Sequence, residues 1–191
     1  MKGFFTKGTY PSFLAFWLKL PLRRLILSPG KLAARLNLEK TFRVLEIGPG
    51  PGYFSIEVAK HLTEGHLELL DIQKDMLEKA RKRIAASGLD NVGFICGDAS
   101  ELPFKENSFD VVFLVAVLGE VSAPEACIKS IYRVLKPGGL LSITEQPGDP
   151  DFVPSHTVRS LVEKQGFKFV KFYGKNKNYT VNFRKFPAIA T

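Results

Sequence analysis

The stretch Val44-Leu45-Glu46-Ile47-Gly48-Pro49-Gly50-Pro51-Gly52-Tyr53-Phe54 decides how this chain folds. Its apolar start predicts a short buried strand, which runs into a glycine-rich loop and then into a helix. Glycine lacks a Cβ, so the loop can take positive φ angles and let a ligand approach the bare backbone. The helix that follows starts with free N–H groups. This arrangement indicates a site for a nucleotide-like ligand, but the glycine loop by itself does not say which one.

The size and composition of the chain indicate one globular domain. It has 191 residues, of which 45% are hydrophobic and 24% are charged, and this is enough for one core and short for two domains. The two cysteines, Cys96 and Cys127, lie in apolar segments and are expected to be reduced and buried. No Cys/His spacing is typical of a zinc site, so we expect no metal and a cytoplasmic location.

The positive charge is concentrated at the two ends of the chain. Residues 1–43 contain nine Lys or Arg and one acid, and residues 164–191 contain seven Lys or Arg and no acid. The middle, residues 44–163, contains 18 acids against 11 basic residues. Two basic ends that meet in space would form a face for lipid or nucleic-acid phosphates, and the alternative is an ordinary solvated surface.

Residues 1–40 are expected to form a helical extension ahead of the main domain. Residues 10–28 are rich in large apolar side chains but are interrupted by Lys19, Pro21 and two arginines, so they contain no spanning helix. The short apolar run followed by arginines also argues against an export signal. Two interpretations remain: a lid that packs over the domain, or a peripheral contact with a membrane surface. Residues 31–38 predict a further helix.

The main domain, residues 41–191, alternates strands and helices. Near-continuous apolar strands of this kind are buried on both faces, which predicts a parallel sheet covered by helices on each side. The chain then ends in a helix and two alternating segments around a Gly/Asn loop, which predict an antiparallel hairpin. The expected strands are 43–47, 66–71, 92–96, 109–115, 140–145, 167–173 and 179–186, and the expected helices are 53–62, 74–87, 123–135 and 155–165.

The carboxyl ends of the parallel strands are expected to bring glycines and carboxylates to one edge of the sheet, where such folds bind ligands. Asp71 ends the second strand, 19 residues after Gly52, and could bind a ribose diol, cap a helix or lie on the surface. The loop reads Gly-x-Gly-x-Gly rather than the dinucleotide pattern, because Tyr53 replaces the third glycine. Asp98 follows the third strand in Gly-Asp-Ala, placed to meet an adenine amino group.

Together these segments resemble class I S-adenosylmethionine-dependent methyltransferases, of the type 11-like branch that acts on small molecules, lipids or quinones. The resemblance covers residues 43 to about 146 and implies a Rossmann-like α/β fold with seven strands in the order 3-2-1-4-5-7-6, strand 7 being antiparallel. It also implies S-adenosyl-L-methionine as cofactor and S-adenosyl-L-homocysteine as product. The matching segments are Val44–Gly52, Asp71 with Met76, Gly97–Phe104, Ser108–Val112 and Arg133–Gly139.

The resemblance implies a role for each matching residue. Glu46 would orient the methionine amino end, Asp71 would hold the ribose hydroxyls, and Asp98 would bond the adenine N6. Ile72 would pack on the adenine, and Met76 would either contact the adenine or pack within its helix. The implied cofactor-binding residues are Glu46, Gly48, Pro49, Gly50, Gly52, Tyr53, Asp71, Ile72, Met76, Gly97, Asp98, Ala99, Leu114 and Val115.

The methyl acceptor is less well defined by the sequence. Leu118-Gly119-Glu120 stands where many relatives carry a histidine, so Glu120 is either a base or a solvated acid. His156 and Tyr179 could reach the pocket mouth or be structural, and no catalytic residue is assigned. The aromatic-rich residues 13–27 suit a hydrophobic small-molecule, lipid or quinone-precursor acceptor.

Other functions stay open at this point. The chain could methylate RNA or protein after docking through its basic ends, although the absence of an Asn/Asp-Pro-Pro-aromatic motif argues against common amino-methylating enzymes of nucleic acids. It could also bind the cofactor without catalysis, and a dehydrogenase is the most distant alternative.

Overall fold

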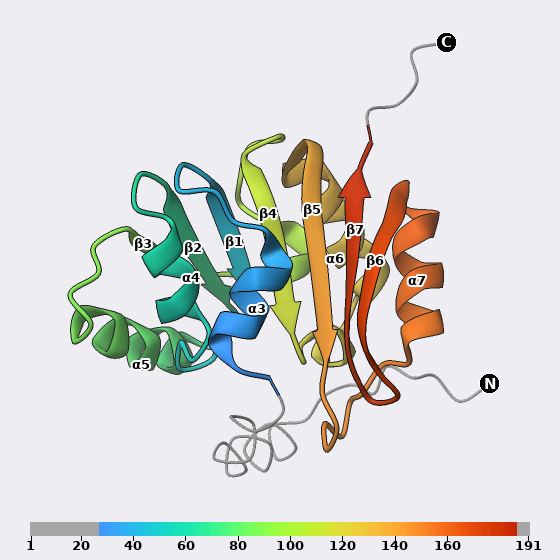
Figure 1. The fold of residues 1–191 in the computed structure, drawn as a ribbon, viewed down its shortest axis with the longest axis horizontal. Helices are drawn as coiled ribbons and strands as arrows, with labels where there is room; N and C mark the ends of the chain where they lie inside the picture. Colours follow the sequence, from blue (N-terminus) through green and yellow to red (C-terminus); the bar gives the residue numbers. More distant parts are fainter. Residues whose placement is uncertain (1–26, 187–191) are drawn as a thin grey trace.

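The structure is a computed structural model that describes residues 27–186. Residues 1–26 and 187–191 lie outside the described part. The expected lid or membrane contact over residues 10–28 therefore falls almost wholly outside it. The described chain begins at Leu27, near the carboxyl ends of the parallel strands (Figure 1).

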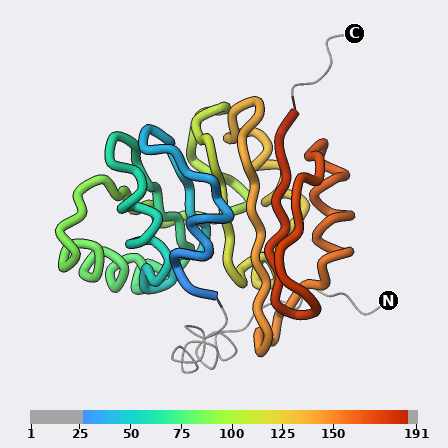
Figure 2. Tube along the Cα trace, in the orientation of Figure 1, coloured from blue at the N-terminus to red at the C-terminus, as the bar shows by residue number. Residues whose placement is uncertain are grey.

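One seven-stranded sheet forms the centre of the molecule, and its strand order confirms the expectation from the sequence. The order is β3-β2-β1-β4-β5-β7-β6, and β7 pairs antiparallel with both β5 and β6. The other neighbouring pairs are parallel (Figures 1 and 2). The strands are β1 (Arg43–Ile47), β2 (His66–Asp71), β3 (Val92–Cys96), β4 (Phe109–Val115), β5 (Leu135–Glu145), β6 (Phe167–Lys175) and β7 (Asn178–Lys185).

Helices cover both faces of this sheet. On one face lie α3 (Pro29–Leu36), α4 (Ser55–His61) and α5 (Lys74–Ala85), and on the other lie α6 (Pro124–Val134) and α7 (Ser155–Lys164). Two short 3-10 turns, η1 (Ala99–Glu101) and η2 (Leu118–Glu120), follow the carboxyl ends of β3 and β4. The result is the three-layer α/β architecture that the alternating pattern predicts.

The apolar strands divide their side chains between two cores. Val44 and Phe113 pack with α3, α4 and α5 in one cluster, whereas Leu45 and Val112 pack with α6 and α7 in the other. Successive side chains of a strand point to opposite faces. A strand covered on both sides is therefore apolar at every position, which explains why these segments do not alternate with polar residues.

Helix α3 begins two residues earlier than expected, and a side-chain hydrogen bond connects it to strand β7. The Ser28 hydroxyl accepts a hydrogen bond from the Lys31 N–H at 3.3 Å, and Pro29 occupies the first turn, so the helix starts at Pro29. The Arg35 guanidinium donates to the Thr180 hydroxyl of β7 at 2.7 Å. This contact ties the end of α3 to β7, in the C-terminal half of the sheet.

Two expectations from the sequence are corrected by the structure. Strand β5 begins at Leu135 rather than Leu140, because Leu135 already pairs with Phe109 before the register shifts to Val111 and Leu140. The expected turn at residues 136–139 is thus an irregular part of the strand, with Gly138 at φ +79°. Cys96, expected to be buried, is exposed at the end of the edge strand β3, while Cys127 is buried as expected.

The turn before β2 gives a test of this packing. A Cβ on Gly65 would lie 2.2 Å from the Phe42 carbonyl oxygen, so Gly65→Ala should lower the free energy of unfolding by roughly 1–3 kcal/mol. A Cβ on Gly30, inside α3, would meet nothing within 4 Å. Gly30→Ala is the matched control and should raise stability by up to about 1 kcal/mol. Denaturant unfolding of both variants checks the expectation, and equal stability of the two would contradict it.

Candidate active site

The glycine loop after β1 is held in a shape that requires glycine. Gly48, Gly50 and Gly52 all have positive φ angles, of +66°, +52° and +75°. The Gly48 N–H donates to the Leu70 carbonyl at 2.8 Å and so continues the pairing of β1 with β2. A Cβ on Gly48 would lie 2.4 Å from a methyl group of Val117, so the β1 and β4 loops touch at this point.

Glu46 lies beneath the loop and is almost wholly buried, with 2% of its surface exposed. Its carboxyl oxygen accepts a hydrogen bond from the Ser55 hydroxyl at 2.6 Å, at the start of α4. Burial raises the pKa of Glu46 to about 8; the Ser55 hydrogen bond opposes this shift and the charge of Asp71 adds to it. A cationic group brought next to this carboxyl would favour its ionised form.

Asp71 connects the end of β2 to the glycine loop. Its carboxylate accepts the Gln73 N–H at 2.9 Å and is also hydrogen-bonded by the backbones of Gly50 and Ile72. Burial raises its pKa, while these hydrogen bonds act in the opposite direction. Ile72, by contrast, leaves 68% of its side chain exposed beside this buried carboxylate. An apolar surface and a fixed acceptor therefore lie side by side at the edge.

The end of β3 lies next to the end of β2 and adds a further carboxylate, Asp98, to this edge of the sheet. The Asp98 carboxylate accepts the N–H of Ser100 at 2.8 Å and also the Ser100 hydroxyl, so it caps η1, and these bonds lower its pKa. Its side chain stays exposed, whereas Ala99 beside it is buried. The Gly97 N–H donates to the Asp71 carbonyl at 3.1 Å, which joins the second and third strand ends.

The remaining expected residues lie nearby or within the cores. Tyr53 is partly buried and packs edge-on against Phe54 at 4.8 Å between ring centroids, and Met76 is 8% exposed on α5. Pro49, in the glycine loop, is buried. Leu114 is fully buried in the core and Val115 is 6% exposed. Leu114 therefore offers no exposed surface at this edge.

Sequence reasoning missed the strained residue that follows β4. Ala116 has a φ of +55°, which non-glycine residues rarely adopt. Its N–H donates to the Thr144 carbonyl of β5 at 2.8 Å, which fixes the turn. Backbone strain of this kind gathers at functional sites. It aims the following residue, Val117, at Gly48, and the only sequence signal for it was its position at the end of a buried strand.

A group of acids lies at the ends of β4 and β5. Carboxylate oxygens of Glu120, Asp149 and Asp151 lie within 4.8 Å of one another. Burial raises the pKa of the adjacent Glu145, and these three carboxylates raise it further. Sequence reasoning singled out only Glu120 of the four. It also named Tyr179, whose hydroxyl donates to the Val153 carbonyl at 2.5 Å from a fully buried position, and His156, which is exposed.

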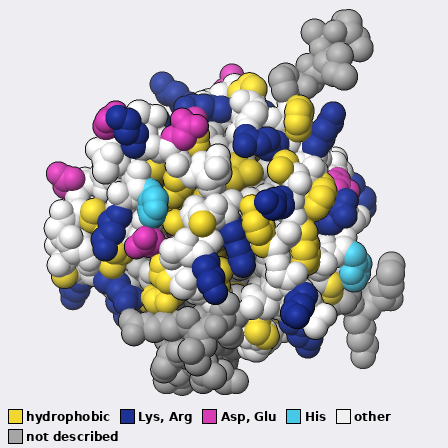
Figure 3. Space-filling view, in the orientation of Figure 1, with side chains coloured by type: hydrophobic (Ala, Val, Ile, Leu, Met, Phe, Trp, Pro, Cys, Tyr) yellow, Lys and Arg dark blue, Asp and Glu magenta, His cyan; other side chains and the backbone are white. Residues whose placement is uncertain are grey.

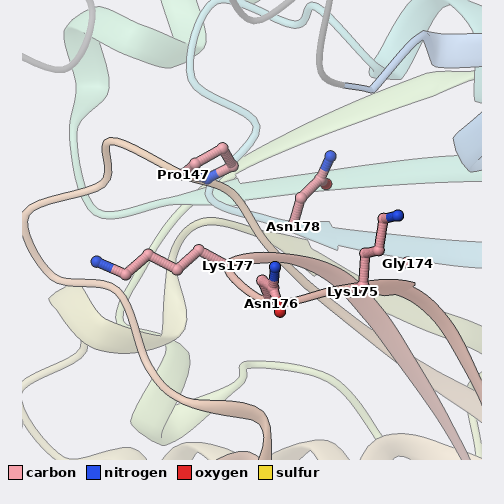
Figure 4. Close-up of a pocket in the computed structure, with 6 residues that line it drawn as sticks. All are labelled: Pro147, Gly174, Lys175, Asn176, Lys177 and Asn178. Carbon is pink, nitrogen blue, oxygen red and sulfur yellow. The ribbon is translucent and has the colours of Figure 1, made fainter.

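A pocket opens at the start of the loop after β5. It lies between Pro147, in the loop after β5, and the tip of the β6–β7 hairpin (Figure 4). Its volume is about 460 Å³. The ammonium group of Lys177 also lies 5.9 Å from the centroid of the Phe152 ring, which joins the hairpin tip to the same loop. The hairpin tip and the loop after β5 thus enclose one side of the carboxyl edge.

Comparison with known proteins identifies the family. A family profile described as "Methyltransferase domain" matches residues 38–176. The chain belongs to this methyltransferase family. Demethylmenaquinone methyltransferase of Listeria monocytogenes serotype 4a is 34% identical over 160 residues, which cover 81% of this chain and 68% of that protein. The ubiquinone/menaquinone biosynthesis C-methyltransferase UbiE of Ruegeria sp. is 38% identical over 104 residues, covering 54% of this chain and 42% of UbiE.

The solved structures that resemble this methyltransferase show the same fold. An S-adenosylmethionine-dependent methyltransferase from Aquifex aeolicus matches 92% of this chain and 99% of its own, with a TM-score of 0.82 and 22% identity. The [4+2]-cyclase SpnF matches 84% of this chain and 80% of its own, with a TM-score of 0.73 and 20% identity. The family assignment makes this chain an S-adenosylmethionine-dependent methyltransferase. Its acceptor has to be argued from the site.

Within residues 27–186, no helix is both long enough and apolar enough to cross a bilayer.

The buried Glu46 predicts a measurable dependence of stability on pH. Its pKa of about 8 in the folded state exceeds its ordinary value of 4.5. The folded protein therefore holds a proton that the unfolded chain loses, and stability should fall as the pH rises from 4.5 to 8. The slope is about 1.4 kcal/mol per pH unit, a few kcal/mol in all.

Glu46→Gln removes this titration and keeps the shape of the side chain. The variant should therefore gain stability relative to wild type between pH 5 and pH 8, as measured by urea unfolding at each pH. Glu57→Gln, on the neighbouring helix α4, is the control and should show the wild-type profile. A constant difference between Glu46→Gln and wild type across this pH range would contradict the assignment.

Proposed function

We propose that S-adenosylmethionine binds along the carboxyl edge, between the glycine loop and the ends of β2, β3 and β4. The observation that carries this proposal is the pairing of a glycine cradle with the buried Asp71 carboxylate, joined by the hydrogen bond to the Gly50 backbone. The edge fits an adenosine ligand, because it offers bare backbone, a fixed acceptor and the exposed apolar surface of Ile72 in one row.

In this proposal, each residue along the carboxyl edge contacts a different part of the cofactor. Asp71 accepts hydrogen bonds from the ribose hydroxyls, Ile72 packs on the adenine, and Asp98 accepts from the adenine amino group with its exposed oxygen. Glu46 lies under the loop and favours the methionine ammonium group electrostatically. The remaining residues of the proposed site line this path: Gly48, Pro49, Gly50, Gly52, Tyr53, Met76, Gly97, Ala99, Leu114 and Val115.

The protein's contribution to methyl transfer is mainly positional. The bound cofactor supplies an electrophilic methyl group on a sulfonium. The rigid loop, held by the Gly48–Leu70 hydrogen bond and by packing on Val117, fixes the site against which an acceptor is aligned. Such alignment can lower a barrier by roughly 7–11 kcal/mol. A base is required only where the acceptor must lose a proton. The candidate for this role is Glu120 on η2, three residues after Val117.

We further propose that the acceptor is a hydrophobic small molecule of the quinone-precursor class. The support is the chain's similarity to relatives named for demethylmenaquinone and for ubiquinone/menaquinone biosynthesis. The aromatic-rich residues 13–27 favour such an acceptor, and a peripheral membrane contact through residues 10–28 would suit a lipid-soluble one. The pocket between Pro147 and the hairpin tip opens at the same edge.

One observation supports a second candidate, a methyltransferase that acts on RNA or protein. Residues 164–186 carry their basic side chains on α7, β6 and β7 without an intervening acid, and Lys168, Lys171 and Lys175 are exposed. On the face shown in Figure 3, Lys and Arg outnumber Asp and Glu. Binding to RNA through such a surface would weaken steeply with salt.

The role of Asp71 is tested by the affinity for S-adenosylhomocysteine. Asp71→Asn should weaken binding by roughly tenfold to a hundredfold, because a hydrogen bond to a charged group contributes about 1.5–3 kcal/mol. Asp90→Asn, an exposed acid before β3, is the matched control and should bind as wild type does. Calorimetric titration measures both, and equal affinity of the two variants would contradict the ribose role.

The acceptor class is tested by methyl transfer from labelled S-adenosylmethionine. Dihydroxynaphthalene and dihydroxybenzene acceptors with an isoprenoid tail should be methylated at least tenfold faster than structured RNA or lysine-rich peptides. Removing residues 1–26 should reduce this turnover and leave binding of S-adenosylhomocysteine measurable. Salt-sensitive methylation of RNA with no turnover of the aromatic acceptors would favour the second candidate instead.

A further inference from the structure

We propose that Glu120, Asp149 and Asp151 form a binding site for a hard divalent cation, at the end of the sheet edge next to the proposed cofactor site. Glu120 comes from η2, after β4, and the two aspartates come from the loop after β5. Binding of the ion does not depend on the proposed acceptor. Only the role given to the ion below rests on the proposed function.

The geometry of the three carboxylates suits one ion. One oxygen from each lies within 4.8 Å of the others. Two oxygens on opposite sides of a calcium ion are at most about 4.6–5.2 Å apart, and around magnesium about 4.2 Å. Three oxygens this close together can meet a single ion of the size of calcium after small side-chain adjustments, and the smaller magnesium ion requires somewhat larger ones.

Backbone contacts hold the two loops together. Gly119 lies so close to the second loop that a Cβ there would be 1.8 Å from the Asp151 carbonyl oxygen. The Asp151 N–H donates to an Asp149 carboxylate oxygen at 2.9 Å, which fixes the turn between them. The backbone thus brings acids from two different strand ends to one place.

A second observation points to a ligand here. Glu145, the last residue of β5, is fully buried, and its Oε1 has no hydrogen-bond partner. Its other oxygen lies 3.5 Å from the Val153 N–H, a long contact. The charges of Asp149, Glu120 and Asp151 all act on this carboxyl, so it lies within electrostatic range of the cluster. A buried carboxyl with an unsatisfied oxygen is costly, and a cation bound at the neighbouring cluster would lower that cost.

The donor set selects the kind of ion. Carboxylate oxygens favour hard cations such as Mg²⁺, Mn²⁺ and Ca²⁺, and offer none of the nitrogen or sulfur ligands that Zn²⁺ and Cu²⁺ prefer. Three monodentate carboxylates leave other coordination positions open, since these ions take six or more ligands. Because Glu120 follows Val117, which contacts Gly48, an oxygen-bearing acceptor could occupy an open position close to the proposed methyl donor.

Metal binding by the full-length chain tests the proposal directly. After removal of metals with chelator, Mn²⁺ is titrated and followed by its paramagnetic resonance signal, and Mg²⁺ and Ca²⁺ are titrated by calorimetry. We expect one bound ion per chain and a melting temperature that rises with ion concentration. Asp151→Asn and Glu120→Gln should each weaken the affinity at least tenfold.

Matched controls separate this site from ordinary surface acids. Asp90→Asn and Glu78→Gln remove exposed acids elsewhere and should leave metal affinity unchanged. No ion bound at millimolar concentration, no shift in the wild-type melting temperature, or equal affinity of all variants would each overturn the proposal. The wild-type measurements stand even if a variant fails to fold.

A parallel titration with S-adenosylhomocysteine in the absence of metal separates the two proposals. Normal binding of this product by a chain that binds no cation overturns only the cation site. Cation binding without binding of S-adenosylhomocysteine overturns the proposed cofactor site and leaves the cation site standing.

Discussion

The contact between Gly48 and Val117 is the constraint on which the carboxyl edge depends. β1 is flanked by β2 on one side and β4 on the other. The chain leaves β1 towards α4 on one face of the sheet and leaves β4 towards α6 on the opposite face. Such a point in a parallel sheet opens a crevice for a ligand. Here the β4 loop turns back through the strained Ala116 and sets Val117 against the loop after β1. Only a residue without a Cβ fits at position 48.

Acidic groups buried at this edge carry a cost in stability. Glu46, Asp71 and Glu145 are all buried, and burial raises the pKa of each. A fold selected for stability alone would place apolar residues at such positions. Each acid instead lies at a strand end where a ligand can reach its neighbourhood. Glu46 and Asp71 are also proposed binding groups, and Glu145 lies near the proposed cation site, as expected where sites store unfavourable interactions.

Much of the fold could be predicted from the sequence because local and global signals agree. The first four strands match their expected bounds, since runs such as Val44–Ile47 are buried on both faces and are bounded by glycine or polar residues. The predicted start of β5 at Leu140 was wrong, because the pairing of Leu135 with Phe109 is a long-range contact that no local pattern encodes. The exposure of Cys96 also depends on β3 being the edge strand, a property of the assembled sheet.

The candidate site was predictable only in part, for similar reasons. The glycine loop, Asp71 and Asp98 follow strand ends, so the rule about carboxyl edges placed them together. The grouping of Glu120 with Asp149 and Asp151 requires the close approach of Gly119 to a distant loop, and a search for Cys/His spacing could not reveal it. The positive φ of Ala116 likewise could not be predicted, because alanine is common in ordinary strands and helices and does not mark a strained position.

A crystal structure of the chain with S-adenosylhomocysteine would reveal where the cofactor binds. We expect electron density for the ligand between the Gly48–Gly52 loop and Ile72, with both ribose hydroxyls bonded to Asp71. Density at any other place on the molecule, or a bound ligand that leaves Asp71 without a contact, would contradict it.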